Sequence, residues 1–220
     1  DSSTSRGLGD VYKRQNTFPT WSLAQPFRVI AHNGEINTLK GNKNWMAAHE
    51  PRMEHKNFGN NVDDLKPIID AKASDSAALD STIELLVKAN RSLPMAKIIT
   101  IPEAWSHRRD FPKKIKDLYA YGGAVMEPWD GPAAICGAYG DWAIAGMDRN
   151  GLRPIRYTLT KNLLIAGSET GMVDIKENEI VERGRVGPGQ LIAVNFKEKK
   201  FFKDHELSLI HISEPTRRRG

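Results

Sequence analysis

Hydrophobic and polar positions recur at different intervals along the chain. Residues 27–31 form a short apolar run, which is typical of a buried strand. The pair Asn33–Gly34 follows after one residue and predicts a turn, because both residue types tolerate positive φ. Residues 37–52 begin with Asn and Thr, which are good N-cap residues, and predict a helix.

The strongest helical signal lies in AALDSTIELLVKAN, residues 77–90, where apolar side chains recur three and four positions apart. The polar residues 74–76 precede this segment and mark its start. A short helix is predicted after Pro94, and another over residues 112–121. Most of the middle of the chain is therefore expected to be helical.

From residue 132 onward the pattern changes to short apolar or alternating runs that turn residues separate. The first four runs predict consecutive antiparallel strands: PAAICGA (132–138), DWAIAGMD (141–148), PIRYTLT (154–160) and LLIAGSE (163–169). A last pair of strands, 180–185 and 190–196, surrounds Gly187–Gly189, whose Pro-Gly step suits a type II turn. Helices followed by strands predict a layered α+β domain and not alternating βαβ units.

Composition agrees with a globular domain of this kind. The 220 residues are 40% hydrophobic and 27% charged, and no apolar run reaches the ~20 residues that span a bilayer. We therefore expect a soluble protein. The single cysteine, Cys136, cannot form an intramolecular disulfide, so we expect a reducing compartment, the cytoplasm.

The two ends of the chain are related through their coding DNA. One coding of SRGLGDVYKRQ, residues 5–15, has a reverse complement that translates as LSLIHISEPTR, the sequence of residues 207–217. We therefore expect residues 1–15 and 207–220 to be translated sequencing adapter, and residues 16–206 to be a partial domain, incomplete at its N-terminus. The two ends carry +3 of the net charge of +5, so the basic charge gives little support to a nucleic-acid partner.

Common cofactor and metal motifs do not occur in the sequence. It contains no HExxH, no P-loop and no GxGxxG, so neither a metal centre nor a nucleotide site is predicted. Cys136 lies inside an apolar strand segment, where a buried, inert thiol is the expected role.

Two short polar segments are candidates for catalysis and binding. In AHNGEINT, the Asn33 amide and the Gly34 N–H have the chemistry of an oxyanion hole, although Asn-Gly is also a common hairpin turn. Asp75 in SDSAALD lies at a helix N-terminus, where it could cap the helix or receive the ammonium group of an amino acid. The charges of DRNGLRP, residues 148–154, are expected to brace a turn between strands.

The order of these segments resembles the glutamine amidotransferase domain of glutamate synthase, a class II amidotransferase. The resemblance rests on HNGEINT, SDSAALD, MEPWDGPAA, DRNGLRPIRY, the Ser-Glu pair at 168–169 and GRVGPGQL, and it covers nearly all of residues 16–206. It implies an N-terminal-nucleophile hydrolase fold, a four-layer αββα sandwich. It also implies that Asn33 and Gly34 form the oxyanion hole and that Asp75 holds the substrate's α-amino group.

The resemblance further implies hydrolysis of L-glutamine to glutamate and ammonia, which is channelled to 2-oxoglutarate. The nucleophilic cysteine of that family and its carboxylate-binding Arg precede the segment retained here as NTFPTW, so we expect this chain to be inactive. FMN and an iron–sulfur cluster are implied for a synthase part of the same polypeptide, outside this chain. The implied partner is a small NADPH-oxidising subunit or ferredoxin.

Three alternatives remain open at this point. The chain could belong to a class II amidotransferase that delivers ammonia to another acceptor, which the downstream sequence of the gene would decide. It could also be a non-catalytic module with an amidotransferase-like shell, which a parent gene without the upstream cysteine would favour. A basic nucleic-acid binder is the third.

Overall fold

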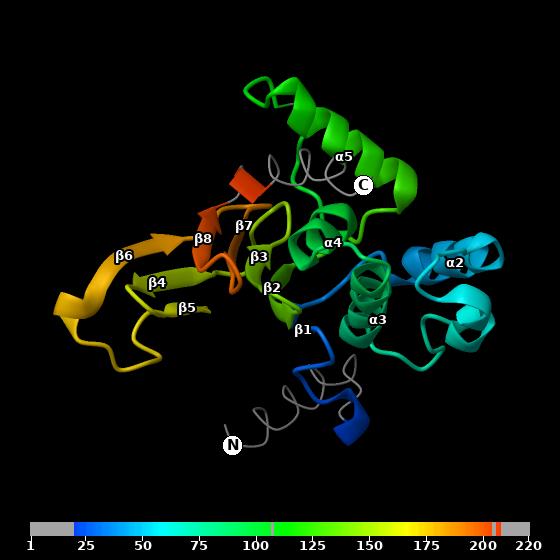
Figure 1. Ribbon diagram of the computed structural model, residues 1–220, viewed down its shortest axis with the longest axis horizontal. Coiled ribbons are helices and arrows are strands. Elements are labelled where there is room, and N and C mark those ends of the chain that lie inside the picture. Colours follow the sequence, from blue (N-terminus) through cyan, green and yellow to red (C-terminus); the bar gives the residue numbers. More distant parts are fainter. Residues whose placement is uncertain (1–19, 107, 204–205, 208–220) are drawn as a thin grey trace, which may run out of the picture.

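The computed structural model describes residues 20–106, 108–203 and 206–207 (Figure 1). Apart from β1 (Ile30–Gly34), its strands follow its α-helices, as the hydrophobic pattern predicts. The α-helices are α2 (Leu39–His49), α3 (Asp75–Lys88), α4 (Leu93–Thr100) and α5 (Lys113–Val125). Short 3-10 helices cover Trp21–Leu23, Glu50–Arg52, Gly59–Leu65 and Glu177–Glu179.

The strands form two antiparallel sheets. The remaining strands are β2 (Ala133–Tyr139), β3 (Trp142–Met147), β4 (Arg156–Thr160), β5 (Leu164–Gly167), β6 (Ile180–Arg185), β7 (Leu191–Asn195) and β8 (Lys200–Lys203). One sheet has the order β1-β2-β3-β7-β8 and the other the order β5-β4-β6. The predicted run of four consecutive paired strands is therefore wrong, because β2-β3 and β4-β5 are hairpins in different sheets.

The last two predicted strands are present, but they do not pair with each other. β6 pairs with β4, whereas β7 pairs with β3 and β8. The turn itself is correct: the Gln190 N–H donates to the Gly187 carbonyl at 3.0 Å, and Gly189 has a φ of +73°. This turn leads the chain from the three-stranded sheet to the five-stranded sheet instead of joining neighbouring strands.

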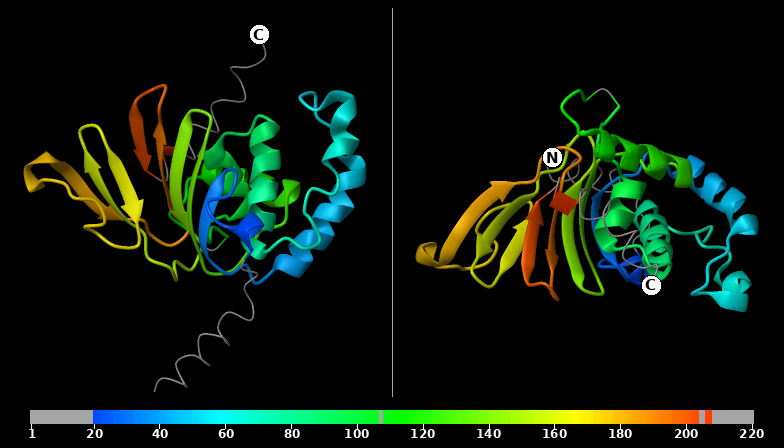
Figure 2. Two further views of the ribbon diagram at one scale, coloured as in Figure 1. Left: turned by 90° about the horizontal axis from the view of Figure 1, so that it is seen from below. Right: turned by 45° about the horizontal axis from the view of Figure 1, so that its top comes forward.

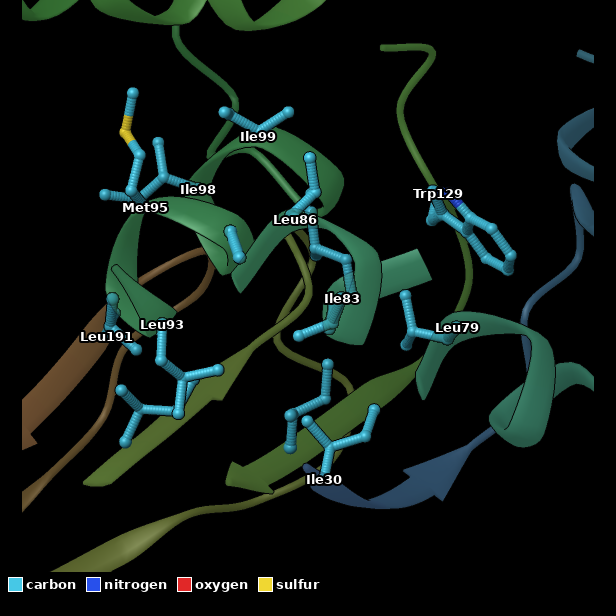
Figure 3. Packing of buried hydrophobic residues seen from close by; sticks show 14 of the residues in the cluster. Ile30, Leu79, Ile83, Leu86, Leu93, Met95, Ile98, Ile99, Trp129 and Leu191 are labelled. Atoms are coloured by element: carbon cyan, nitrogen blue, oxygen red, sulfur yellow. The ribbon is translucent and has the colours of Figure 1, made fainter. Parts of the chain in front are cut away.

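The sheets and helices lie in layers (Figure 2). Helices α3 and α4 cover one face of the five-stranded sheet, and their apolar side chains meet Ile30 and Leu191 of that sheet (Figure 3). The three-stranded sheet lies on its other face, where Ala145, Met147 and Tyr157 pack between the sheets. This arrangement confirms the α+β class and supplies three of the four expected layers. Among the described residues, no α-helix covers the outer face of the three-stranded sheet.

The packing of one residue near the C-terminus differs from expectation. Leu207 was expected to lie outside the domain and to pack little, yet it is fully buried in the core between helices and sheet. Residues 1–15 and 208–220 lie outside the described residues. None of the helices that the structure describes is both long and apolar enough to cross a membrane.

Candidate functional site

The candidate site lies at the end of β1. Asn33 and Gly34 are the last two residues of this strand, opposite Ala134 and Ala133 of β2, so the predicted hairpin turn at this position is wrong. Glycine is required here for space and not for a positive φ. A Cβ on Gly34 would lie 1.8 Å from the carbonyl oxygen of Pro132, which the Glu35 N–H already binds at 2.9 Å.

The Gly34 N–H faces the open edge of the sheet. β1 is an edge strand, and the N–H groups of an antiparallel strand alternate between its neighbour and its free side. On the free side the Ile30 N–H binds Asp80 Oδ1 at 2.8 Å and the His32 N–H binds Gln25 Oε1 at 2.5 Å. The next N–H on that side, that of Gly34, has no acceptor among the described residues.

Asn33 contributes a second free donor at the same strand end. Its side chain is exposed, and among the described residues its amide makes no hydrogen bond. Two adjacent donors, one from a side chain and one from the backbone, therefore remain available to an oxygen atom that carries developing negative charge.

The Asp75 carboxylate lies next to this strand end and does not cap its own helix. Ser74 is the N-cap of α3, where its side chain accepts the Ala77 N–H at 3.2 Å. Asp75 is half-buried, and its Oδ2 accepts the N–H of Ile36, two residues beyond Gly34, at 2.9 Å. The capping interpretation of Asp75 is therefore wrong, and Oδ1 remains available to a cation.

Helix α3 contacts β1 at three points along its length. At the start of the strand, the buried Asp80 carboxylate accepts the N–H groups of Val29 at 3.0 Å and Ile30 at 2.8 Å. At its middle, His32 Nδ1 and Ser76 Oγ are 2.8 Å apart. Beyond the end of the strand, Asp75 accepts the Ile36 N–H. Sequence reasoning assigned no role to His32, Ser76 or Asp80. Ser76 and Asp80 are four residues apart on α3, and this spacing places them on one face of the helix.

His32 is buried and neutral in this site. Burial is the main cause that lowers the pKa of its imidazole below the usual 6.5, and the charge of Arg153 lowers it further. Asp75, the Pro132 carbonyl and Asp148 act in the opposite direction. The Pro132 carbonyl lies close but does not meet hydrogen-bond geometry, so His32 Nε2 is a buried atom without a partner in the described part of the chain.

The segments around Pro132 are braced by charges, as predicted for DRNGLRP. The Asp148 carboxylate is 1% exposed and accepts the N–H groups of Ala133 at 2.8 Å, Asn150 at 3.0 Å and Gly151 at 3.0 Å. Arg149 forms an ion pair with Asp130. Together these bonds fix the chain that presses against Gly34.

Cys136 is not part of this constellation. It lies in the middle of β2 and packs in the layer between the sheets, where burial raises the pKa of its thiol. These features agree with the predicted inert role. Among the described residues, no group of three or more His, Cys, Asp or Glu side chains could hold a metal ion.

Comparison with known proteins places the chain in a family. Residues 11–216 match the family described as glutamine amidotransferases class-II. The chain belongs to this family. Its segments HNGEINT and SDSAALD, whose residues meet at the end of β1, lie inside the matched range.

The curated relatives that the chain matches are much longer proteins. The chain is 55% identical over 193 residues to the glutamate synthase [NADPH] large chain of Azospirillum brasilense, covering 87% of this chain and 13% of the relative. It is 47% identical over 205 residues to ferredoxin-dependent glutamate synthase 2 of Synechocystis, covering 90% and 13%. It is also 47% identical over 194 residues to glutamate synthase [NADH] of Schizosaccharomyces pombe, covering 87% and 9%.

Among solved structures, glutamine phosphoribosylpyrophosphate amidotransferase from B. subtilis matches with a TM-score of 0.46 and 18% identity. The match covers 84% of this chain and 32% of that protein.

Proposed function

We propose that this domain binds L-glutamine at the end of β1 and releases ammonia from its side-chain amide, as the glutaminase part of a glutamate synthase. The observation that carries the proposal is the meeting, at one strand end, of two free donors from Asn33 and Gly34 with the carboxylate of Asp75. The family membership of the chain and the names of its relatives support it.

Each group has a distinct task in this proposal. When a nucleophile adds to the amide carbon of glutamine, the carbonyl oxygen becomes negatively charged, and the Asn33 amide and Gly34 N–H stabilise that charge. The C–N bond then breaks as the leaving NH2 group takes the proton that the base removed from the nucleophile and departs as ammonia. Water hydrolyses the acyl group that remains on the nucleophile, which gives glutamate and regenerates the nucleophile. Asp75 pairs with the substrate's ammonium group before and during these steps.

The nucleophile is proposed to be the cysteine that the family resemblance places at the mature N-terminus, with its own α-amino group as the base. Cys136 does not fill this role, because it lies in the packed layer between the sheets and its thiol stays protonated. We therefore expect the chain of 220 residues by itself to release no ammonia from glutamine above background.

The acceptor of the ammonia is proposed to be 2-oxoglutarate, with FMN and an iron–sulfur cluster in other parts of the full-length enzyme. This chain has one cysteine, and such clusters are held by several thiolates, so its residues do not fit that cofactor. A synthase part of the same polypeptide and either a small NADPH-oxidising subunit or ferredoxin are the proposed partners, and the cytoplasm is the proposed compartment.

The proposal is tested by Asp75→Asn in the full-length enzyme, with glutamate formed from glutamine and 2-oxoglutarate as the readout. Loss of the charge should raise the KM for glutamine about 10- to 100-fold, as expected when a hydrogen bond to a charged group is weakened. Asp70→Asn, which changes an exposed carboxylate in the loop before α3, is the matched control and should leave the KM unchanged.

Synthesis from added ammonia should persist in both variants, because it bypasses glutamine. An unchanged KM in Asp75→Asn would refute the assigned role. Glutamine consumption that does not depend on 2-oxoglutarate, but depends on another acceptor, would instead identify a different class II amidotransferase.

A further inference from the structure

A buried polar pair connects the strand of the oxyanion donors to the helix of Asp75. His32 lies between Ile30 and Gly34 on the side of β1 that faces the helices, and its Nδ1 is 2.8 Å from Ser76 Oγ at the start of α3. His32 is 5% exposed and Ser76 is 7% exposed. A buried hydrogen bond of this kind fixes the position of both partners, because neither can exchange its bond for one to water.

The Ser76 hydroxyl also reaches the candidate binding group. Its oxygen is 3.4 Å from Asp75 Oδ1, a long contact that leaves this carboxylate oxygen able to accept a shorter bond from a ligand's ammonium. A hydroxyl has one proton to donate. If Ser76 donates it to Asp75, then His32 Nδ1 must carry a proton and donate to Ser76, and a continuous chain runs from β1 to the carboxylate.

The other end of the imidazole lies against the oxyanion strand. His32 Nε2 is 2.8 Å from the point where a Cβ on Gly34 would lie, so the ring packs directly on the residue whose N–H is free. A rotation of the ring would break the Ser76 contact and change the packing against Gly34. Burial lowers the pKa of His32, which favours the neutral ring with a single proton. Nδ1 donates to Ser76 Oγ in one tautomer of this ring and accepts from it in the other, and the contact joins the two residues in both.

We propose that His32 and Ser76 are positioning residues, which orient the Asp75 carboxylate toward the substrate's ammonium group and hold it in register with the oxyanion donors of β1. The inference rests on the proposed function, since it assigns the support of the glutamine site. Neither residue touches the reacting atoms.

The test is Ser76→Ala in the full-length enzyme, with KM and kcat for glutamine measured separately. Loss of one hydroxyl that orients the carboxylate should raise the KM about 3- to 10-fold and change kcat less than about twofold. Ser81→Ala is the matched control, because Ser81 lies on the same helix and, within the described part of the chain, its hydroxyl bonds only the Ala77 carbonyl, at 3.1 Å. This control should leave both constants unchanged.

Two further variants separate positioning from packing. His32→Asn retains a polar atom near the position of Nδ1 and should raise the KM less than His32→Leu, which retains none. In the background of Asp75→Asn, Ser76→Ala should change the KM less than about twofold, because the group that it orients has already lost its charge. Ammonia-dependent synthesis in each variant reports that the enzyme is folded.

The outcomes distinguish this inference from the proposed function. If Asp75→Asn raises the KM but Ser76→Ala does not, or if the two effects simply add, the positioning role of His32 and Ser76 is refuted and the glutamine site stands. If Asp75→Asn leaves the KM unchanged, the proposed function itself is refuted. A lower melting temperature in Ser76→Ala with an unchanged KM would show that the pair is structural only, and would also overturn the inference.

Discussion

Substitution of Gly34 by Ala tests the geometry on which the site depends. The new Cβ would lie 1.8 Å from the Pro132 oxygen, 2.7 Å from its carbonyl carbon and 2.8 Å from His32 Nε2. The carbonyl cannot easily retreat, because its oxygen binds the Glu35 N–H and the next residue, Ala133, is bonded to the buried Asp148. Overpacking typically costs 1–3 kcal/mol, and a clash with fixed backbone places this variant at about 3 kcal/mol.

The assay is thermal unfolding of the chain followed by circular dichroism. For a domain of this size, about 3 kcal/mol corresponds to a melting temperature lower by about 6–12 °C. Gly41→Ala is the matched control. Gly41 lies within α2, and among the described residues an added Cβ would meet no atom outside its own stretch of helix within 4 Å. Helix propensity should therefore stabilise this variant by up to about 1 kcal/mol. A Gly34→Ala variant that melts within about 1 °C of the parent would refute the close approach of Pro132.

Three other changes follow from the same contacts. Ser74→Ala removes the N-cap bond of α3 and should destabilise the chain by about 1 kcal/mol in urea unfolding, whereas an unchanged midpoint would reject that cap. Asp148→Asn cannot accept three backbone N–H groups with one oxygen and should cost about 3 kcal/mol; a loss below about 1 kcal/mol would contradict its bracing role. The pKa of His32 is lower in the folded chain than its usual 6.5, so the contribution of the neutral ring to stability should be full above pH 6.5 and fall as the pH drops toward the folded pKa. Urea unfolding midpoints between about pH 7 and pH 5.5 should show this fall, and His32→Asn should flatten it. An equal dependence of the midpoint on pH in both proteins would reject the buried neutral ring.

The local elements of the fold could be predicted from the sequence because their signals are local. Apolar side chains three and four residues apart specify α3 whatever surrounds it, and alternating runs specify β2 to β5. The division of those strands between two sheets could not be predicted. A strand that is apolar on one face shows the same pattern whether its neighbour in sequence pairs with it or crosses to the other sheet.

The sequence names the residues of the candidate site but does not give their geometry. Asn33–Gly34 has the composition of a turn, and only the approach of Pro132, distant in sequence, explains why a strand needs glycine at this position. Ser74 and Asp75 are both good N-cap residues, so the sequence alone does not show that Ser74 caps α3 and leaves Asp75 to bind Ile36. His32 and Ser76 lie 44 positions apart in the sequence and meet only through tertiary packing, so no rule of local spacing connects them.

The most direct test of the glutaminase site is the turnover of glutamine by Asn33→Ala in the full-length enzyme. The charge on the amide oxygen exists only after attack, so loss of this donor should lower the glutamine-dependent kcat by about 10² to 10³, with a smaller effect on KM. Asn37→Ala, which changes an exposed asparagine beyond the strand end, should leave kcat unchanged, and both variants should still form glutamate from added ammonia. Glutamine turnover that survives in Asn33→Ala, or loss of the ammonia-dependent reaction together with it, would contradict an oxyanion hole at the end of β1.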